Sequence, residues 1–212
     1  MKKLKFPKFK NAQAGMTYIE LIVVLSIFSI MSAVIIFNYT KFQAKVDIKN
    51  LANDIALKIV EAQKSSIAGK LPPLAEQAIV PLNWKPAYGV YMNTMSPGSN
   101  KNFIYFADLD QSGDFTDTTS FCSNYSTSGD ECLDKINITK GNYISSIELS
   151  GGGCSATISN LGIAFKRPSA EAVFSSNPAL GCTPTFVVIN INSPQNLSAK
   201  VKLWASGRLE IQ

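Results

Sequence analysis

A stretch of twenty residues without a single charged side chain constrains this chain more than any other feature. It covers residues 21–40 and reads LIVVLSIFSIMSAVIIFNYT. A helix of that length rises about 30 Å, which matches the hydrocarbon thickness of a bilayer. Because a backbone in lipid must satisfy its own hydrogen bonds, the stretch is predicted to be a membrane-spanning helix.

The charges around this stretch predict its orientation. Five lysines and no acid precede Gly15, at positions 2, 3, 5, 8 and 10. Such a cluster holds the N-terminus in the cytoplasm and places everything after Thr40 outside. The chain has 20 basic and 15 acidic residues, so its formal charge of +5 equals the charge of these lysines. The rest of the chain is balanced, and nucleic acid is not predicted as a partner.

Two ordinary explanations of the apolar stretch compete with a more specific one. A cleaved secretory signal has an apolar core of about 7–15 residues and then a small-residue cleavage site. This stretch is longer and ends in Phe37-Asn38-Tyr39. A plain uncleaved anchor for an external domain is the second explanation, and it leaves Glu20 unaccounted for.

Glu20 lies at the edge of the apolar stretch, where a carboxylate costs roughly 2.5–3.5 kcal/mol to place in lipid. The next cation along the chain is Lys41, about six helical turns away. A partner must therefore come from another chain or from a newly made charge. Cleavage after Gly15 would create one, the free amine of Met16, which could meet Glu20 of a neighbour in a stack of parallel helices.

The segment at residues 15–25, GMTYIELIVVL, resembles the class III signal of type IV pilins and pseudopilins. The resemblance implies that a prepilin peptidase cuts after Gly15 and that Met16 becomes an N-methylated mature N-terminus. It also implies that Glu20, the fifth mature residue, guides assembly. The family usually has Phe where Met16 stands and often Leu where Tyr18 stands.

Residues 41–68 are predicted to continue the helix as an amphipathic segment. Apolar residues recur at spacings of three or four, at Ile48, Leu51, Ile55, Ile59 and Ala62. No proline or glycine interrupts residues 16–68, so we expect one helix about 80 Å long. Gly69 and Pro72-Pro73 would end it, followed by a linker to residue 87. The stripe is expected to pack on the chain's own head.

The head is predicted at residues 88–212, where short apolar or alternating runs are separated by turn residues. Strand-like runs cover residues 88–92, 103–107, 143–149, 162–165, 186–191 and 200–204, and Ser206-Gly207 predicts a hairpin turn into residues 208–211. We expect an α+β fold, with a mainly antiparallel sheet of about six to nine strands on the helix. The resemblance is closest to minor pseudopilins with an H-type head, on the N-terminus, residues 51–66 and the last hairpin.

All four cysteines follow the apolar stretch, in the part predicted to lie outside. Four cysteines allow three pairings. We favour Cys122–Cys132, which closes a short polar loop, and Cys154–Cys182, which ties a glycine-rich turn to a later strand. Free or metal-binding thiols are the alternative. No C-x-x-C spacing exists, so disulfides are favoured over zinc.

An acidic segment at residues 102–134 contains no lysine or arginine. Its DLDQSGDFTD motif resembles the first half of an EF-hand calcium loop, with glycine where the loop turns sharply. The candidate Ca²⁺ ligands are Asp108, Asp110, Ser112 and Asp114, with Asp117 in place of the glutamate that position twelve (Thr119) lacks. The alternative is a polar hairpin tip with solvated carboxylates.

No catalytic set is visible. The absence of histidine excludes Ser-His-Asp and Cys-His catalysis and histidine zinc ligands. The aspartates lie in one turn-rich loop rather than across a cleft, as a glycosidase requires. Gly151-Gly152-Gly153 is followed by Cys154 instead of a phosphate-binding lysine, so we expect no enzyme.

The sequence therefore predicts a structural subunit, minor by the size of its head, of a type IV pilus or a type II secretion pseudopilus. The resemblance implies other pilin or pseudopilin subunits, the prepilin peptidase and methyltransferase, a membrane assembly platform and the lipid bilayer as partners. The precursor would cross the inner membrane once, with a periplasmic or extracellular head. A membrane-anchored surface binding module or adhesin that does not polymerise is the first alternative, and an anchored hydrolase the second.

Overall fold

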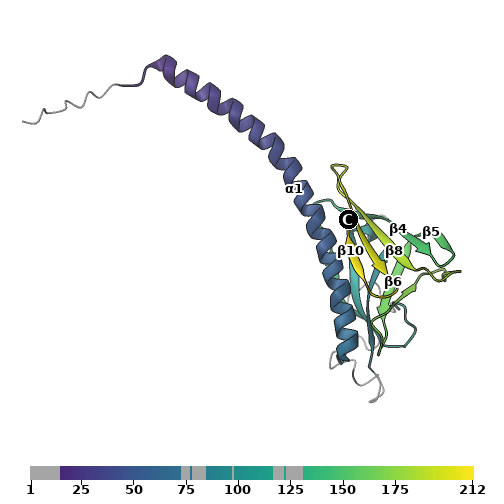
Figure 1. Cartoon of the computed structure of the whole chain (residues 1–212). Helices are drawn as coiled ribbons and strands as arrows, with labels where there is room; N and C mark the ends of the chain where they lie inside the picture. Colours follow the sequence, from purple (N-terminus) through teal and green to yellow (C-terminus); the bar gives the residue numbers. More distant parts are fainter. Residues whose placement is uncertain (1–14, 73–76, 78–84, 97, 117–121, 123–130) are drawn as a thin grey trace, which may run out of the picture. The chain divides into compact units, whose positions relative to one another are not determined.

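The computed structural model describes residues 15–72, 77, 85–96, 98–116, 122 and 131–212, without the side chain of Phe37. Its elements are one α-helix, a short 3-10 helix and ten strands within these ranges (Figure 1). The chain divides into two compact units, Met1–Phe42 and Gln43–Gln212, which are described in turn. The leader predicted at residues 1–15 lies outside the described residues except for Gly15.

The described part of the first unit is the beginning of α1, which spans Tyr18–Ala68. Thr17 caps the helix: the N–H of Glu20 donates to its Oγ1 at 3.4 Å, and the N–H of Leu21 donates to its carbonyl at 3.1 Å. The helix thus begins two residues after Met16. It is long and apolar enough to cross a membrane. None of the described side chains at residues 21–40 is buried.

The second unit contains the rest of α1, which ends at Ala68 in a glycine cap. Gly69 adopts φ +62°, a left-handed conformation that glycine takes without steric cost. Its N–H donates to the carbonyl of Ser66, and that of Lys70 donates to the carbonyl of Ser65, both at 3.0 Å. This pair of bonds is a Schellman motif, and it confirms the predicted end of the helix.

Ten antiparallel strands form two five-stranded sheets, with orders β3-β2-β1-β6-β7 and β10-β9-β8-β4-β5. The first sheet contains β1 (Ala87–Asn93), β2 (Asn102–Asp108), β3 (Cys132–Asn137), β6 (Asn160–Phe165) and β7 (Ala172–Ser175), and η1 (Ser99–Lys101) precedes β2. The second contains β4 (Tyr143–Gly151), β5 (Cys154–Ile158), β8 (Phe186–Asn192), β9 (Ser198–Trp204) and β10 (Leu209–Ile211).

The α+β class and the antiparallel pairing agree with the prediction, whereas the expected single sheet is wrong. Each predicted strand has a counterpart, but β3, β5 and β7 were not predicted. These strands are four to six residues long, and most of their side chains are only partly buried or exposed. Their apolar pattern is therefore weak, and local pattern gives no information on which strands pair.

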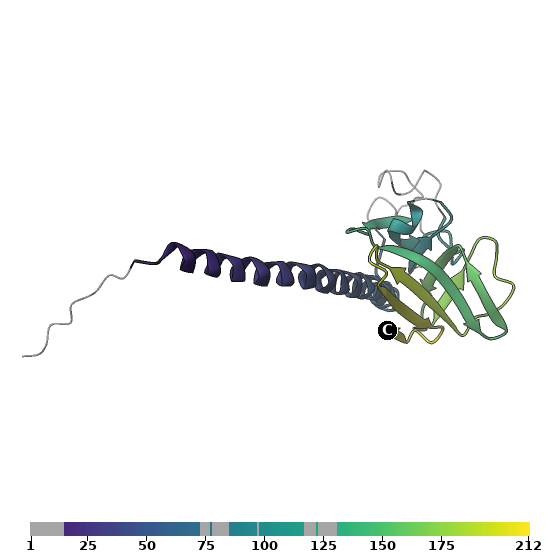
Figure 2. The same cartoon turned by 90° about the horizontal axis from the view of Figure 1, so that it is seen from above.

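One hydrophobic core joins the second half of α1 to both sheets. The helix lies alongside the strands over this half (Figure 1), and seen from above it meets them at one side of the head (Figure 2). All five residues of the predicted stripe are buried: Ile48, Leu51, Ile55, Ile59 and Ala62. They share the core with Tyr88 and Phe165 of the first sheet and with Ile147 and Val201 of the second. The prediction that this half packs on the chain's own head is confirmed.

Candidate functional site

The predicted processing segment lies at the start of the described chain. Gly15 and Met16 are exposed and precede α1, so the bond between them lies outside regular secondary structure. Glu20 is exposed in the first turn of the helix, where the positive end of the helix dipole favours a carboxylate. The cleavage, the methylation of Met16 and the assembly role of Glu20 remain predictions.

Both predicted disulfides are present. The Cα atoms of Cys122 and Cys132 are 5.5 Å apart, and those of Cys154 and Cys182 are 5.6 Å apart. No cysteine is free. Cys132 of the first bridge is the first residue of β3. Cys154 of the second bridge follows the glycine turn between β4 and β5. The alternative of a four-thiol metal site is therefore wrong.

Three carboxylates come together where β2 ends and β3 begins. Asp108 is the last residue of β2, Asp110 follows in the loop, and Glu131 immediately precedes β3. The N–H of Ala107 donates to the carbonyl of Glu131 at 2.9 Å, which extends the pairing of the two strands. One oxygen from each of the three carboxylates lies within 4.8 Å of the other two. We call these three residues the carboxylate cluster.

Glu131 holds the loop through backbone hydrogen bonds. Its Oε1 accepts from the N–H groups of Leu109, at 2.9 Å, and Asp110, at 3.4 Å. Its Oε2 accepts from the N–H of Thr116 at 2.7 Å. Glu131 is only 1% exposed, so these bonds replace the water it has lost. Its carboxylate therefore has a fixed position at the base of the loop.

Asp108 is equally buried but less well satisfied. Its side chain is 1% exposed, and its Oδ2 accepts a hydrogen bond from the N–H of Gly113 at 3.0 Å. Its Oδ1 is buried and accepts no hydrogen bond from the residues that the structure describes. A buried carboxylate oxygen without a partner is costly, and such an atom in a native structure requires an explanation.

Asp110 completes the cluster from the solvent side. It is exposed, and its Oδ1 accepts a hydrogen bond from the N–H of Ser112 at 2.8 Å. Gly113 turns the loop back with φ +78°, and a Cβ there would lie 2.6 Å from Nζ of Lys166. The ammonium of Lys166 is thus close to the loop, yet no ion pair within 4.0 Å joins the cluster to a cation among the described residues.

Burial changes the acidity of the two inner carboxyls. It raises the pKa of Asp108 to about 6, and the carboxylate of Asp110 adds to this effect. It raises the pKa of Glu131 to about 7, although the N–H groups of Thr116 and Leu109 act in the opposite direction. Burial also acts against ionisation of Asp110, but hydrogen bonds from Ser112 outweigh it and lower the pKa of that residue.

The cluster differs from the predicted calcium ligands. Asp108 and Asp110 belong to both sets. The Oγ of Ser112 instead donates to the carbonyl of Asp114 and accepts from its N–H, both at 3.2 Å. Oδ1 of Asp114 accepts from the hydroxyl of Ser175 at 2.8 Å, so this carboxylate binds β7. Asp117 lies outside the described residues.

Glu131 lies in the acidic segment at residues 102–134, but the calcium motif does not predict it as a ligand. The motif that suggested calcium extends only to Asp117, and Glu131 reaches the cluster because β3 pairs with β2. Alternating apolar and polar residues on both sides of the acidic loop would have been the only local indication that two strands pair there and bring Glu131 to the cluster. The alternation in β3 is too weak to give that signal.

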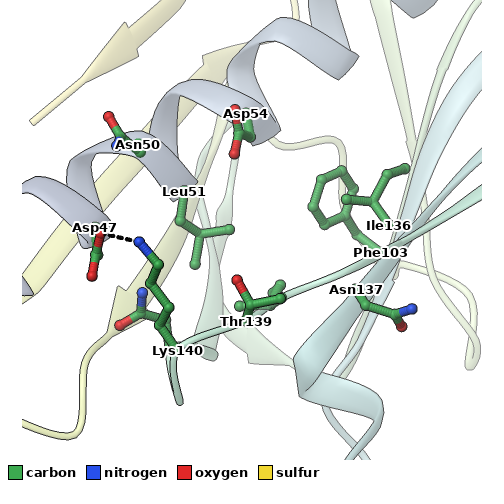
Figure 3. A pocket seen from close by; sticks show the side chains of 11 residues that line it. Asp47, Asn50, Leu51, Asp54, Phe103, Ile136, Asn137, Thr139 and Lys140 are labelled. Carbon is green, nitrogen blue, oxygen red and sulfur yellow. Dashed lines mark hydrogen bonds and ion pairs between the residues drawn. The ribbon is translucent and has the colours of Figure 1, made fainter.

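A separate pocket of about 240 Å³ lies between the second half of α1 and the segment after β3. Figure 3 shows Asp47, Asn50 and Asp54 on the helix side and Thr139 and Lys140 on the other. Nζ of Lys140 forms an ion pair with Oδ1 of Asp47 at 2.6 Å. The pair joins the loop to the helix, and we assign no reaction to this pocket.

No protein-family model, curated protein sequence or solved structure matches the chain. The likeness to pilins therefore depends on the sequence alone: the N-terminal motif, residues 51–66 and the last hairpin. The structure adds an α+β head with two disulfides and one helix able to cross a membrane.

Proposed function

We propose that this protein is a structural subunit, minor in abundance, of a type IV pilus or a type II secretion pseudopilus. The observation that carries the proposal is a single uninterrupted helix with two different halves. Its first half is charge-free after Glu20 and exposed, and its second half belongs to the core of a disulfide-bonded head. Such a subunit would be made as a membrane precursor and cut after Gly15.

The exposed half of the helix needs an apolar environment. Ile19, Phe28 and Ile30 are 72%, 68% and 67% exposed. They lie on the helix that is long and apolar enough to cross a membrane. An apolar surface this continuous is unfavourable in water. Lipid satisfies it in the precursor, and a bundle of identical helices satisfies it in a filament. The same surface therefore supports both states.

Glu20 gives the bundle its register. In lipid or within a helix bundle, a carboxylate strongly favours a paired state over an isolated charge. Cleavage after Gly15 leaves the amine of Met16 four residues before Glu20, close to the first turn of α1. In a parallel bundle, the amine of one subunit would neutralise Glu20 of its neighbour. Proteolysis would in this way control assembly.

The first test is the mature N-terminus. Mass spectrometry of the protein isolated from its native membrane should give a chain that begins at Met16, with or without a methyl group. A chain that retains the lysine-rich leader would contradict the proposal. It would instead favour the membrane-anchored binding module that does not polymerise.

The second test separates assembly from insertion. Glu20→Gln should insert into the membrane normally but lose incorporation into sheared filaments, because it removes the charge that the amine would pair with. Glu171→Gln is the matched control, since Glu171 is an exposed glutamate of the head. Normal incorporation of Glu20→Gln would show that the pairing mechanism is wrong.

A further inference from the structure

We propose that Asp108, Asp110 and Glu131 bind one Ca²⁺ ion, which fastens the base of the loop between β2 and β3. The site goes beyond filament assembly and does not depend on it. Two independent observations carry the inference. Three carboxylate oxygens converge within 4.8 Å, and one buried oxygen of Asp108 accepts no hydrogen bond from any described residue.

The cluster has an unbalanced charge when its members are ionised. Three carboxylates share a small volume, two of them almost fully buried, and no described cation lies within ion-pairing distance of them. A proton can neutralise only one of the three charges. A divalent cation neutralises two and also supplies the missing partner of Oδ1 in Asp108. Buried charges in proteins are generally paired or coordinate metals.

The carboxylates keep lone pairs that a metal ion could use. A carboxylate offers about four lone-pair sites. Glu131 uses three of them for the N–H groups of Leu109, Asp110 and Thr116, and Asp108 uses one for Gly113. The same backbone bonds fix both side chains before any ion arrives. The ion would therefore bind without the entropic cost of ordering its two inner ligands.

The donor set suits Ca²⁺, and its dimensions are compatible with that ion. All three donors are hard oxygens, which suit Ca²⁺ or Mg²⁺ rather than zinc. Opposite ligands of Ca²⁺ are about 4.6–5.2 Å apart, and those of Mg²⁺ about 4.0–4.2 Å. The three donor oxygens lie within 4.8 Å of one another, which is within the span of a Ca²⁺ shell. Waters on the exposed Asp110 side would complete the coordination.

The test uses the full chain in detergent micelles, stripped of metal with EDTA and then dialysed. Isothermal titration with CaCl₂ alone should give one site per chain, with weaker binding of MgCl₂. At a hundredfold excess over Kd, Ca²⁺ should raise the thermal midpoint by about 5–10 °C. The proposal is overturned if CaCl₂ at 10 mM, about 10⁻² M, produces neither heat in the titration nor a thermal shift. Even weak extracellular sites would fill at this concentration.

Variants locate the site. Asp110→Asn should weaken Ca²⁺ binding by at least about 10–100-fold. Mutation of residues that only support the metal ligands already causes a loss of this size. The side chain of Asp110 is exposed, so this variant is expected to fold, and Glu131→Gln gives a second, buried test. Asp54→Asn is the control, because it removes an exposed acid from α1 and should bind Ca²⁺ normally. Unchanged binding by Asp110→Asn and Glu131→Gln would overturn the assignment.

Discussion

The hydroxyl of Ser66, near the end of α1, donates a hydrogen bond to the carbonyl oxygen of Phe165 in β6. The same hydroxyl oxygen accepts a hydrogen bond from the N–H of Tyr88 in β1 at 3.2 Å. Ser66 is completely buried, so a single side chain satisfies one backbone group on each of two neighbouring strands. The helix is thereby attached to the sheet by polar bonds as well as by its apolar stripe.

Ser66→Ala should lower the free energy of unfolding by about 1–3 kcal/mol, because it removes two hydrogen bonds between buried groups. Urea denaturation of the full chain in micelles, followed by circular dichroism of the head, measures the change. Ser155→Ala is the control, since Ser155 is exposed on β5, and it should stay within about 0.5 kcal/mol of the parent. Equal stability of the two variants would contradict the role of Ser66.

Ile55→Ala should cost about 2–5 kcal/mol, the usual range for removing a large aliphatic side chain from a core. Ile55 is fully buried in the stripe of α1, whereas Leu57 on the same helix is 66% exposed. Leu57→Ala should therefore leave the unfolding midpoint of the head unchanged. A similar loss for both variants would mean that the stripe is not what attaches the helix.

The metal-free head should become more stable as the pH falls from 8 to 5. The folded pKa values of Asp108 and Glu131, about 6 and about 7, lie above the values near 4 expected in the unfolded chain. The folded state therefore binds more protons in this range, and the stability they contribute is lost as the pH rises through 6 and 7. The nearby charges are Asp110, whose lowered pKa titrates below this window, and Lys166.

Thermal unfolding in EDTA at several pH values measures this trend, and the absence of histidine leaves no other side chain that ordinarily titrates between pH 5 and 8. Saturating Ca²⁺ should reverse the trend, because the ion binds the ionised carboxylates. A metal-free head that is less stable at pH 5 than at pH 8 would contradict the burial of these two groups.

Removal of the Cys122–Cys132 bridge should destabilise the head by about 2–4 kcal/mol, since the cross-link restricts the unfolded chain. The double variant Cys122→Ser/Cys132→Ser, compared with the parent by urea denaturation, measures this loss. Residual Ca²⁺ binding by the same variant would show whether the bridge is also needed to hold Glu131 in place. No change in stability would indicate that the reduced loop is already fixed by other contacts.

Local patterns predicted the parts of this structure that depend on neighbouring residues. The charge-free run predicted the exposed half of α1, and the spacing of three or four between apolar residues from Ile48 to Ala62 predicted its buried half. Pairing between distant strands is not encoded in such patterns. The division into two sheets and the contribution of Glu131 both depend on it, so the cluster was recognised from the sequence only through Asp108 and Asp110.

The Cys122–Cys132 disulfide lies next to Glu131 of the carboxylate cluster. Whether the disulfide and the Ca²⁺ site can form therefore depends on the compartment in which the loop folds. Thiols stay reduced in the cytoplasm, and free calcium there is scarce. Under the proposed topology, a head that stayed in the cytoplasm would lack both the disulfide and the proposed Ca²⁺ ion. Both links at this end of the loop would therefore form only in the compartment where the proposed topology places the head.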